Sequence, residues 1–87
     1  MNPRVINVFP TDDYQLLLTF SNNEQKVFDM KPWLDKGIFI ALSNKELFRK
    51  AYVAWGTVAW NDELDMSPDT LYIESRINTG TFNKAQG

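Results

Sequence analysis

The sequence predicts an α+β domain with a small antiparallel sheet of about four to five strands, begun by an N-terminal β-meander, and two short helices packed against it. Three features lead to this prediction. Apolar residues alternate along residues 14–20, which is the period of a strand with one buried face. Asn22 and Asn23 follow at once and suit a two-residue hairpin turn, because asparagine tolerates positive φ. Ser43 and Ser67 each stand where the capping residue of a helix is expected.

The meander is expected to start with a strand over residues 4–9, which are rich in β-branched and aromatic side chains. A two-residue loop after the second strand places Leu18 opposite Val27 and Leu17 opposite Phe28 in the third. This register is a sharp prediction, since a slip of one residue exchanges the two faces of a strand.

The helices are predicted from their first residues. Ser43 and Glu46 have the spacing of a capping box, which predicts a helix of about two turns. Ser67 caps a final helix in which Pro68 takes the first position and Leu71 is the buried anchor. Before them, the chain leaves the sheet after residue 29 and makes a helical turn at residues 32–34.

The remaining strands are predicted on both sides of Gly56. Residues 52–55 and 57–60 are rich in residues that favour strands, and we expect at least the second run to join the sheet. Trp60 and Phe48 are expected in the core, whereas Trp55, next to a glycine, is harder to bury. Tryptophan and tyrosine are common in protein–protein contacts, so some of the aromatic residues are expected to line an exposed patch.

Composition restricts the classes of function. The chain has 87 residues, a net charge of −2, and no cysteine or histidine. The lack of cysteine removes thiolate metal sites and disulfides and favours the reducing cytoplasm. The lack of histidine removes the usual general base and metal ligand, so we expect no enzyme and no cofactor. No apolar run is long enough for a membrane span; we expect one domain over residues 1–75 and a flexible tail over residues 76–87.

Charge is distributed unevenly along the chain. Residues 61–75 include five acidic and no basic residues. The offsets of these acids imitate a calcium loop, but Pro68 stands where such a loop needs glycine, so no metal site is expected. We expect instead that Asp65 forms an Asx-turn leading into the Ser67 cap and that Asp69 complements the dipole of the last helix.

Several motifs resemble a bacterial family known as domain of unknown function 2442. The later part of the chain carries the pattern Gly56-Thr57-Val58-x-Trp60, followed by Asp65-x-x-Pro68-Asp69-x-Leu71-Tyr72, and the earlier part carries Leu16-x-Leu18-x-Phe20 and Val27-Phe28-Asp29. The chain departs from the family pattern at two turns, where it has Asn22-Asn23 and Asn61-Asp62-Glu63. The resemblance implies a small α+β domain and partner binding of the kind found in two-protein, toxin–antitoxin-like systems, and it does not imply any activity, because none is established for the family.

The residues favour a non-catalytic protein–protein interaction module over other classes. The candidate partner-binding residues are the acidic corner and its flanking aromatics: Trp55, Asp62, Glu63, Asp65, Asp69 and Tyr72. Self-association through a sheet edge is a second route to the same class. The alternative is a regulatory, nucleic-acid-associated domain that uses the helix at Lys45–Lys50, and it is less favoured because the chain as a whole is acidic.

Overall fold

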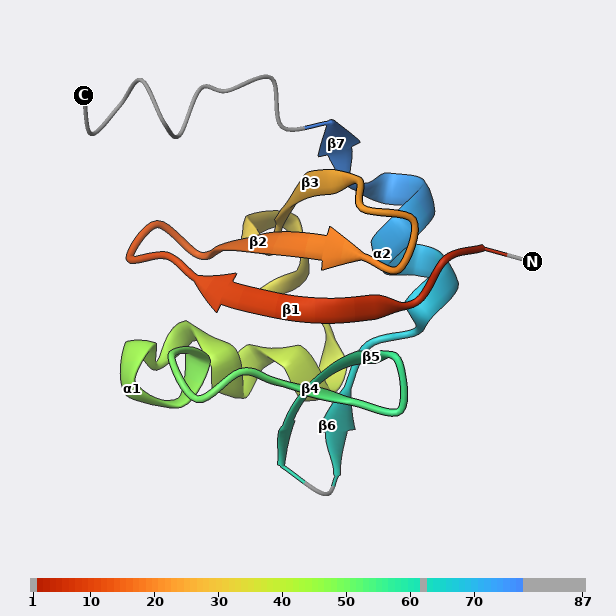
Figure 1. Cartoon of the computed structure of the whole chain (residues 1–87). Helices are drawn as coiled ribbons and strands as arrows, with labels where there is room; N and C mark the ends of the chain where they lie inside the picture. The colour runs from red at the N-terminus through yellow and green to blue at the C-terminus, as the bar shows by residue number, and fades with distance from the viewer. Residues whose placement is uncertain (1, 62, 78–87) are drawn as a thin grey trace.

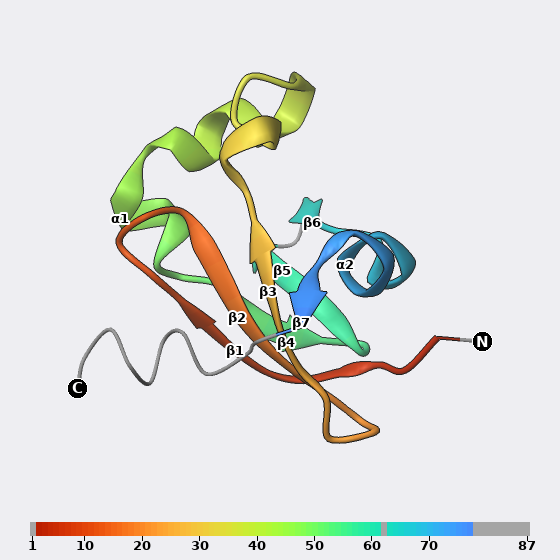
Figure 2. The same ribbon diagram turned by 90° about the horizontal axis from the view of Figure 1, so that it is seen from above.

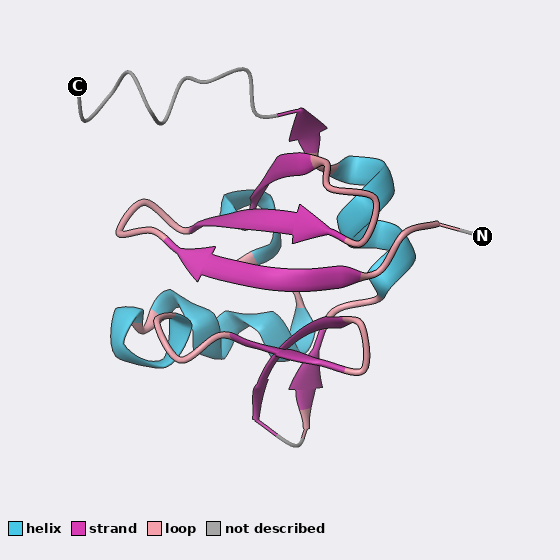
Figure 3. Ribbon diagram, viewed as in Figure 1, coloured by secondary structure: helices cyan, strands magenta, loops and turns pink. Residues whose placement is uncertain are grey.

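Two antiparallel sheets form the framework of the computed structural model, which describes residues 2–61 and 63–77 (Figures 1 and 3). The first sheet has the order β1-β2-β3-β7, with β1 at Val5–Pro10, β2 at Gln15–Phe20, β3 at Gln25–Asp29 and β7 at Arg76–Ile77. The second has the order β4-β5-β6, with β4 at Tyr52–Ala54, β5 at Thr57–Asn61 and β6 at Leu64–Asp65. The predicted α+β class and its N-terminal meander are confirmed.

Short helical segments connect and cover the sheets. Between β3 and β4 lie two 3₁₀ helices, η1 at Lys31–Trp33 and η2 at Gly37–Ser43, and the single turn α1 at Lys45–Phe48. The helix α2, at Pro68–Glu74, lies between β6 and β7 in the chain. Seen from above, the segment from η1 to α1 and the helix α2 lie on different sides of the strands (Figure 2). None of the helices in the described ranges is long and apolar enough to cross a membrane.

The core lies where the two sheets face each other and takes the predicted alternate residues of β2. Leu16, Leu18 and Phe20 are buried, and so are Val58 and Trp60 of β5. The Trp60 indole donates its N–H to the carbonyl of Phe48 at 3.0 Å, so the buried ring has its polar atom satisfied. Leu71 of α2 is fully buried, as predicted, and the Ser67 hydroxyl accepts from the Thr70 N–H. The core therefore includes side chains from both sheets.

The predicted register of the second and third strands is wrong by one residue. Leu17 pairs with Val27, and Leu18 pairs with Lys26. The loop has three residues instead of two, because Phe20 donates its N–H to the Glu24 carbonyl and Asn23 takes φ +71°. This is the turn followed by a left-handed residue that closes three-residue hairpins. Lys26 consequently takes a core-facing position.

The start of α1 also differs from the prediction. Asn44, not Ser43, is the capping residue, and its side chain accepts from the Glu46 N–H at 2.9 Å. Ser43 ends η2 and donates its hydroxyl to the Ile40 carbonyl. The predicted helix of about two turns is a single turn of four residues, because the chain reaches it already wound as a 3₁₀ helix.

Two strands differ in their placement from the prediction. Residues 57–61 form a strand as expected, but it is the centre of the second sheet and is not hydrogen-bonded into the first. Arg76 and Ile77, which the sequence places in the tail, pair with Val27 and Lys26 as β7. The ordered domain thus extends at least to Ile77. Residues 78–87 lie outside the described part of the chain, and the tail there stays a prediction.

Replacing the observed cap of α1 should destabilise the protein more than replacing the predicted one. Asn44→Ala removes the acceptor of the Glu46 N–H and should lower the free energy of unfolding by about 1 kcal/mol. Ser43→Ala removes only an exposed bond to one carbonyl and should cost less than about 0.5 kcal/mol. Urea denaturation of both variants measures the difference, and equal losses would contradict the assignment of Asn44 as the cap.

Candidate functional site

The turn between β4 and β5 presents the most exposed aromatic side chain among the described residues. Trp55 and Gly56 form a two-residue hairpin loop, since Ala54 pairs with Thr57 on either side of it. Both loop residues have positive φ, +52° for Trp55 and +76° for Gly56, which is the signature of a type I′ turn. That turn favours asparagine or glycine at its first position, and a bulky residue there costs about 1–2 kcal/mol. The Trp55 side chain is 91% exposed, so burial in the folded chain does not offset the cost.

The first strand fixes the position of this turn. Val5 donates its N–H to the Gly56 carbonyl at 2.9 Å, and the Arg4 guanidinium donates to the Trp55 carbonyl at 3.4 Å. The Arg4 side chain packs so closely on Gly56 that a Cβ added there would lie 2.9 Å from Nη1 and 3.0 Å from Cβ and Cδ. The backbone that carries Trp55 is therefore held against the first sheet while the indole points into solvent.

Beside Trp55, the outer face of the second sheet is hollowed. The hollow has a volume of about 450 Å³ and is lined by Trp55 from the turn and by Tyr52, Ala54, Thr57, Ala59, Asn61 and Asp65 from the three strands. We call it the β4–β6 groove. Successive strand residues point to opposite faces, so burial of Val58 and Trp60 in the core directs Thr57, Ala59 and Asn61 outward. Thr57 is held by its hydroxyl, which donates to the Met66 carbonyl at 2.6 Å.

The groove has a small-residue floor between taller walls. Ala59 pairs with Tyr52 on one side and with Asp65 on the other, so these three side chains form one row across the sheet. Ala59 and Thr57 are only 5% and 7% exposed although they face outward. The walls therefore shield the floor, and the surface offers an aromatic side, a carboxylate side and an apolar base.

The structure separates the residues that the sequence groups in one acidic corner. Trp55 and Asp65 share the β4–β6 groove. Glu63 is exposed in the β5–β6 turn, where its N–H donates to the Asn61 side chain at 2.9 Å. Asp69 lies at the start of α2 and accepts from the Asn2 amide at 3.1 Å, in a separate small hollow with Pro68. Asp62 lies outside the described residues.

The predicted Asx-turn at Asp65 is replaced by one at Asn61. Asp65 is a residue of β6, paired with Ala59, and its side chain is exposed. Within residues 2–61 and 63–77, no three or more carboxylates are grouped closely enough to hold a metal ion.

Tyr72 belongs to a different surface, over the first sheet. Its ring packs edge-on against Phe20 at 5.0 Å between centroids, and the Lys26 ammonium lies 3.9 Å from the ring centre. The Tyr72 hydroxyl donates to the Glu24 carboxylate at 2.5 Å. This bond, helped by the Asn22 amide, lowers the pKa of Glu24 below its ordinary value of 4.5. The same bond raises the pKa of Tyr72 above 10.0, because the carboxylate stabilises the protonated phenol.

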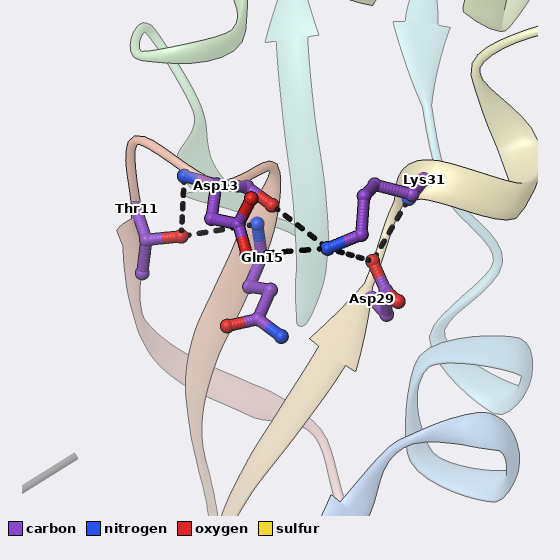
Figure 4. Close-up of polar contacts among 5 residues, drawn as sticks. All are labelled: Thr11, Asp13, Gln15, Asp29 and Lys31. Carbon is purple, nitrogen blue, oxygen red and sulfur yellow. Dashed lines mark hydrogen bonds and ion pairs between the residues drawn. The ribbon is translucent and has the colours of Figure 1, made fainter.

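Three of the five basic residues near η1 and α1 have acidic or aromatic partners, whereas Lys36 and Lys50 have none among the described residues. Lys31 reaches from the end of β3 toward the β1–β2 loop, where its ammonium lies 3.3 Å from the Asp13 carboxylate and 3.5 Å from that of Asp29 (Figure 4). Desolvation alone would lower the pKa of Lys31, but the bonds to Asp13 and the charges of both carboxylates raise it overall. The loop itself is shaped by Thr11, whose hydroxyl accepts from two backbone N–H groups (Figure 4).

Two further cations on this side are occupied in the same way. The Arg49 guanidinium lies 3.2 Å from the Asp12 carboxylate. The Lys45 ammonium lies 5.5 Å from the centre of the Tyr14 ring. Among the described residues, Arg49 is thus the one cation of the helix at Lys45–Lys50 that is paired with a carboxylate.

Sequence reasoning missed five lining residues of the groove: Tyr52, Ala54, Thr57, Ala59 and Asn61. A signal for them was present. Residues 52–54 and 57–61 are two strands joined by a two-residue loop ending in glycine, so alternation from the buried Trp60 assigns each residue to a face. The core position of Trp60 thus determines which residues line the groove.

Comparison with known proteins supports the resemblance seen in the motifs. Residues 5–76 match the family described as "Protein of unknown function (DUF2442)". The chain belongs to this family. The matched range spans β1 to the first residue of β7 and thus includes both sheets and the groove. No curated protein and no solved structure matches the chain, so membership of DUF2442 gives the family and no activity.

Adding a methyl group at Gly56 should disturb the contact between the first strand and the β4–β5 turn. Gly56→Ala places a Cβ against Arg4 and keeps an unfavourable positive φ, so we expect the free energy of unfolding to fall by about 2–3 kcal/mol. Gly37→Ala is the matched control, because Gly37 also has positive φ, +50°, but no atom lies within 4 Å of its added Cβ. It should lose only about 1 kcal/mol. Urea denaturation compares the two, and similar losses would show that the Arg4 contact is unimportant.

Removing the Tyr72 hydroxyl should change how stability depends on pH, in both the acidic and the alkaline range. The lowered pKa of Glu24 stabilises the fold above its ordinary value of 4.5, and this contribution is lost as pH falls through the lowered pKa. The raised pKa of Tyr72 stabilises the fold below 10.0, and this contribution is lost as pH rises through the raised pKa. Tyr72→Phe should therefore have a lower Tm than the wild type near neutral pH, with the difference shrinking in acid and in alkali. Tyr52→Phe is the control and should keep the wild-type profile of Tm against pH.

Proposed function

We propose that this domain is a non-catalytic interaction module that binds a protein partner through the β4–β6 groove and Trp55. The observation that carries the proposal is the state of Trp55, which is 91% exposed at a loop position with φ +52°. A large aromatic side chain in this position stabilises nothing within the described chain. Conformational strain of this kind is retained at binding and catalytic sites, where the surrounding structure maintains it.

The chemistry of the surface supports a protein partner. Tryptophan and tyrosine are the residues that contribute most to binding when they are buried at the centre of an interface. Here the two aromatic side chains, Trp55 and Tyr52, border a floor of small residues that can accept a side chain from outside. Truncating a tryptophan at the centre of an interface typically costs about 2–4 kcal/mol of binding free energy.

The proposal extends to a finer role. We propose that the domain is the partner-binding component of a small bacterial two-protein system of the toxin–antitoxin kind. This role is supported only by the motif resemblance described above, and it requires a second protein that binds with fixed stoichiometry.

The described geometry favours this function over the nucleic-acid alternative. Binding to phosphates requires lysine and arginine side chains that are free to replace condensed counterions. Lys31 and Arg49 instead lie within 3.5 Å of carboxylates of the same chain. The helix α1, which would carry the basic surface, is one turn long.

Replacing Trp55 by asparagine should separate binding from stability. Trp55→Asn supplies the residue that a type I′ turn prefers, so the free energy of unfolding should rise by about 0.5–1 kcal/mol. Partner binding should weaken at least tenfold, because the exposed indole is lost. Urea denaturation measures the first effect. Co-purification from native extract, followed by titration of the identified partner, measures the second.

Ile38→Ala serves as the control, since Ile38 is an exposed apolar residue of η2, which takes no part in the groove. It should keep the wild-type affinity. If Trp55→Asn binds the partner as tightly as the wild type does, the β4–β6 groove is not the interface. If the chain instead binds DNA tightly and in a salt-dependent way, the interaction-module proposal is wrong.

A further inference from the structure

We infer that the segment bound in the β4–β6 groove is an extended peptide chain carrying lysine or arginine, whose cation lies between the Tyr52 ring and the Asp65 carboxylate. This inference rests on the proposed function and specifies its partner. The same three strands supply both walls and the floor of the groove. The chemistry of the bound segment can therefore be derived from the positions of a few side chains.

The width of the groove limits what can enter it. Tyr52 and Asp65 flank Ala59 in one row across the three strands. Neighbouring strands lie about 4.7–4.9 Å apart, so the Cβ atoms of the two walls are separated by roughly 10 Å. A helix with its side chains is about 10–12 Å across and cannot lie between the walls. A single extended chain, with one side chain directed at Ala59, fits this space.

The two walls together favour a cation. An ammonium or guanidinium group is attracted to the face of a tyrosine or tryptophan ring, and it forms charge-assisted hydrogen bonds with a carboxylate. The methylene stem of the same side chain packs on an apolar surface, which Ala59 of the floor and Ala54 of β4 provide. A purely apolar side chain would satisfy only the aromatic wall, and an acidic one would satisfy neither, because it is repelled by the carboxylate and by the negative face of the ring.

The distribution of charge within the chain leaves this carboxylate available. Residues 61–75 contain no lysine or arginine. Among the described residues, the salt bridges join Lys31 to Asp13 and Asp29, and Arg49 to Asp12; none involves Asp65 or Glu63. The positive charge that complements Asp65 must therefore come from outside the described chain.

Trp55 gives the bound segment a direction. It stands at one end of the groove, in the loop next to the Ala54–Thr57 pair, whereas Asp65 stands beside Ala59. An extended chain that places its cation over Ala59 therefore passes the indole at its next residues. Proline at those residues suits an aromatic wall and an extended backbone, as in other modules that bind proline-rich segments.

The test uses a fluorescein-labelled nonapeptide of alternating proline and lysine, titrated with the full chain and followed by fluorescence anisotropy. Two matched peptides carry glutamate or glutamine in place of lysine. We expect binding of the lysine peptide, at least fivefold weaker binding of the glutamine peptide, and none of the glutamate peptide. Raising the salt concentration from about 0.05 to 0.3 M should weaken binding of the lysine peptide and leave binding of the glutamine peptide nearly unchanged.

Three variants locate the cation. Asp65→Asn and Tyr52→Ala should each weaken binding of the lysine peptide about five- to tenfold, whereas Tyr52→Phe, which keeps the ring, should restore it. Asp35→Asn removes another exposed carboxylate, beyond η1, and should change nothing. Unfolding curves of all variants show that each one folds.

Two outcomes overturn the inference. One is equal affinity for the lysine and glutamine peptides, or no binding of either. The other is that the Asp65→Asn variant binds the lysine peptide with the same affinity as the wild type does. If the natural partner nevertheless loses affinity with Trp55→Asn, the groove remains the interface and only the cationic chemistry is wrong. If Trp55→Asn leaves the natural partner unaffected, the proposed function itself fails.

Discussion

The hydrogen bond from the Val5 N–H to the Gly56 carbonyl, 2.9 Å long, is the constraint on which the arrangement of this domain depends. The two sheets are separate ladders, and this bond joins the edge strand of one to the turn of the other (Figure 1). Glycine at position 56 suits this close approach, because an added Cβ would lie 2.9 to 3.0 Å from side-chain atoms of Arg4. The glycine in turn permits the left-handed turn that directs Trp55 outward.

The position of β5 links this constraint to the groove. As the central strand of the second sheet, β5 buries Val58 and Trp60 toward the first sheet. When the buried face of a strand is fixed, the residues that point to its other face are fixed as well, because side chains alternate along the strand. Thr57 and Ala59 are small enough to form a floor, and the neighbouring strands supply Tyr52 and Asp65 as walls. The same side-chain alternation that stabilises the core therefore builds the surface.

Local sequence signals predicted the elements well, and their failures have local causes. Alternation along β2, the Ser67 cap and the core position of Trp60 are confirmed. The hairpin register failed because Asn23 adopts a left-handed conformation that adds one residue to the loop. The acidic corner was predicted as one surface because its residues are close in sequence. The intervening turn and β6 instead place Asp65 in the groove and Asp69 near Asn2, a separation that only the tertiary structure contains.

Charged side chains near η1 and α1 form ion pairs, whereas the carboxylate in the groove forms none among the described residues. This difference gives the groove its chemistry. Around η1 and α1, Lys31 and Arg49 are paired with Asp13 and Asp12 of the first hairpin loop. Exposed ion pairs of this kind contribute little to stability, typically less than about 1 kcal/mol. Their larger effect is to remove positive charge from the side of the chain that is rich in it. The groove carboxylate of Asp65 has no salt-bridge partner among the described residues and lies beside two aromatic side chains. Electrostatic attraction then favours a basic segment over an acidic one before any contact forms.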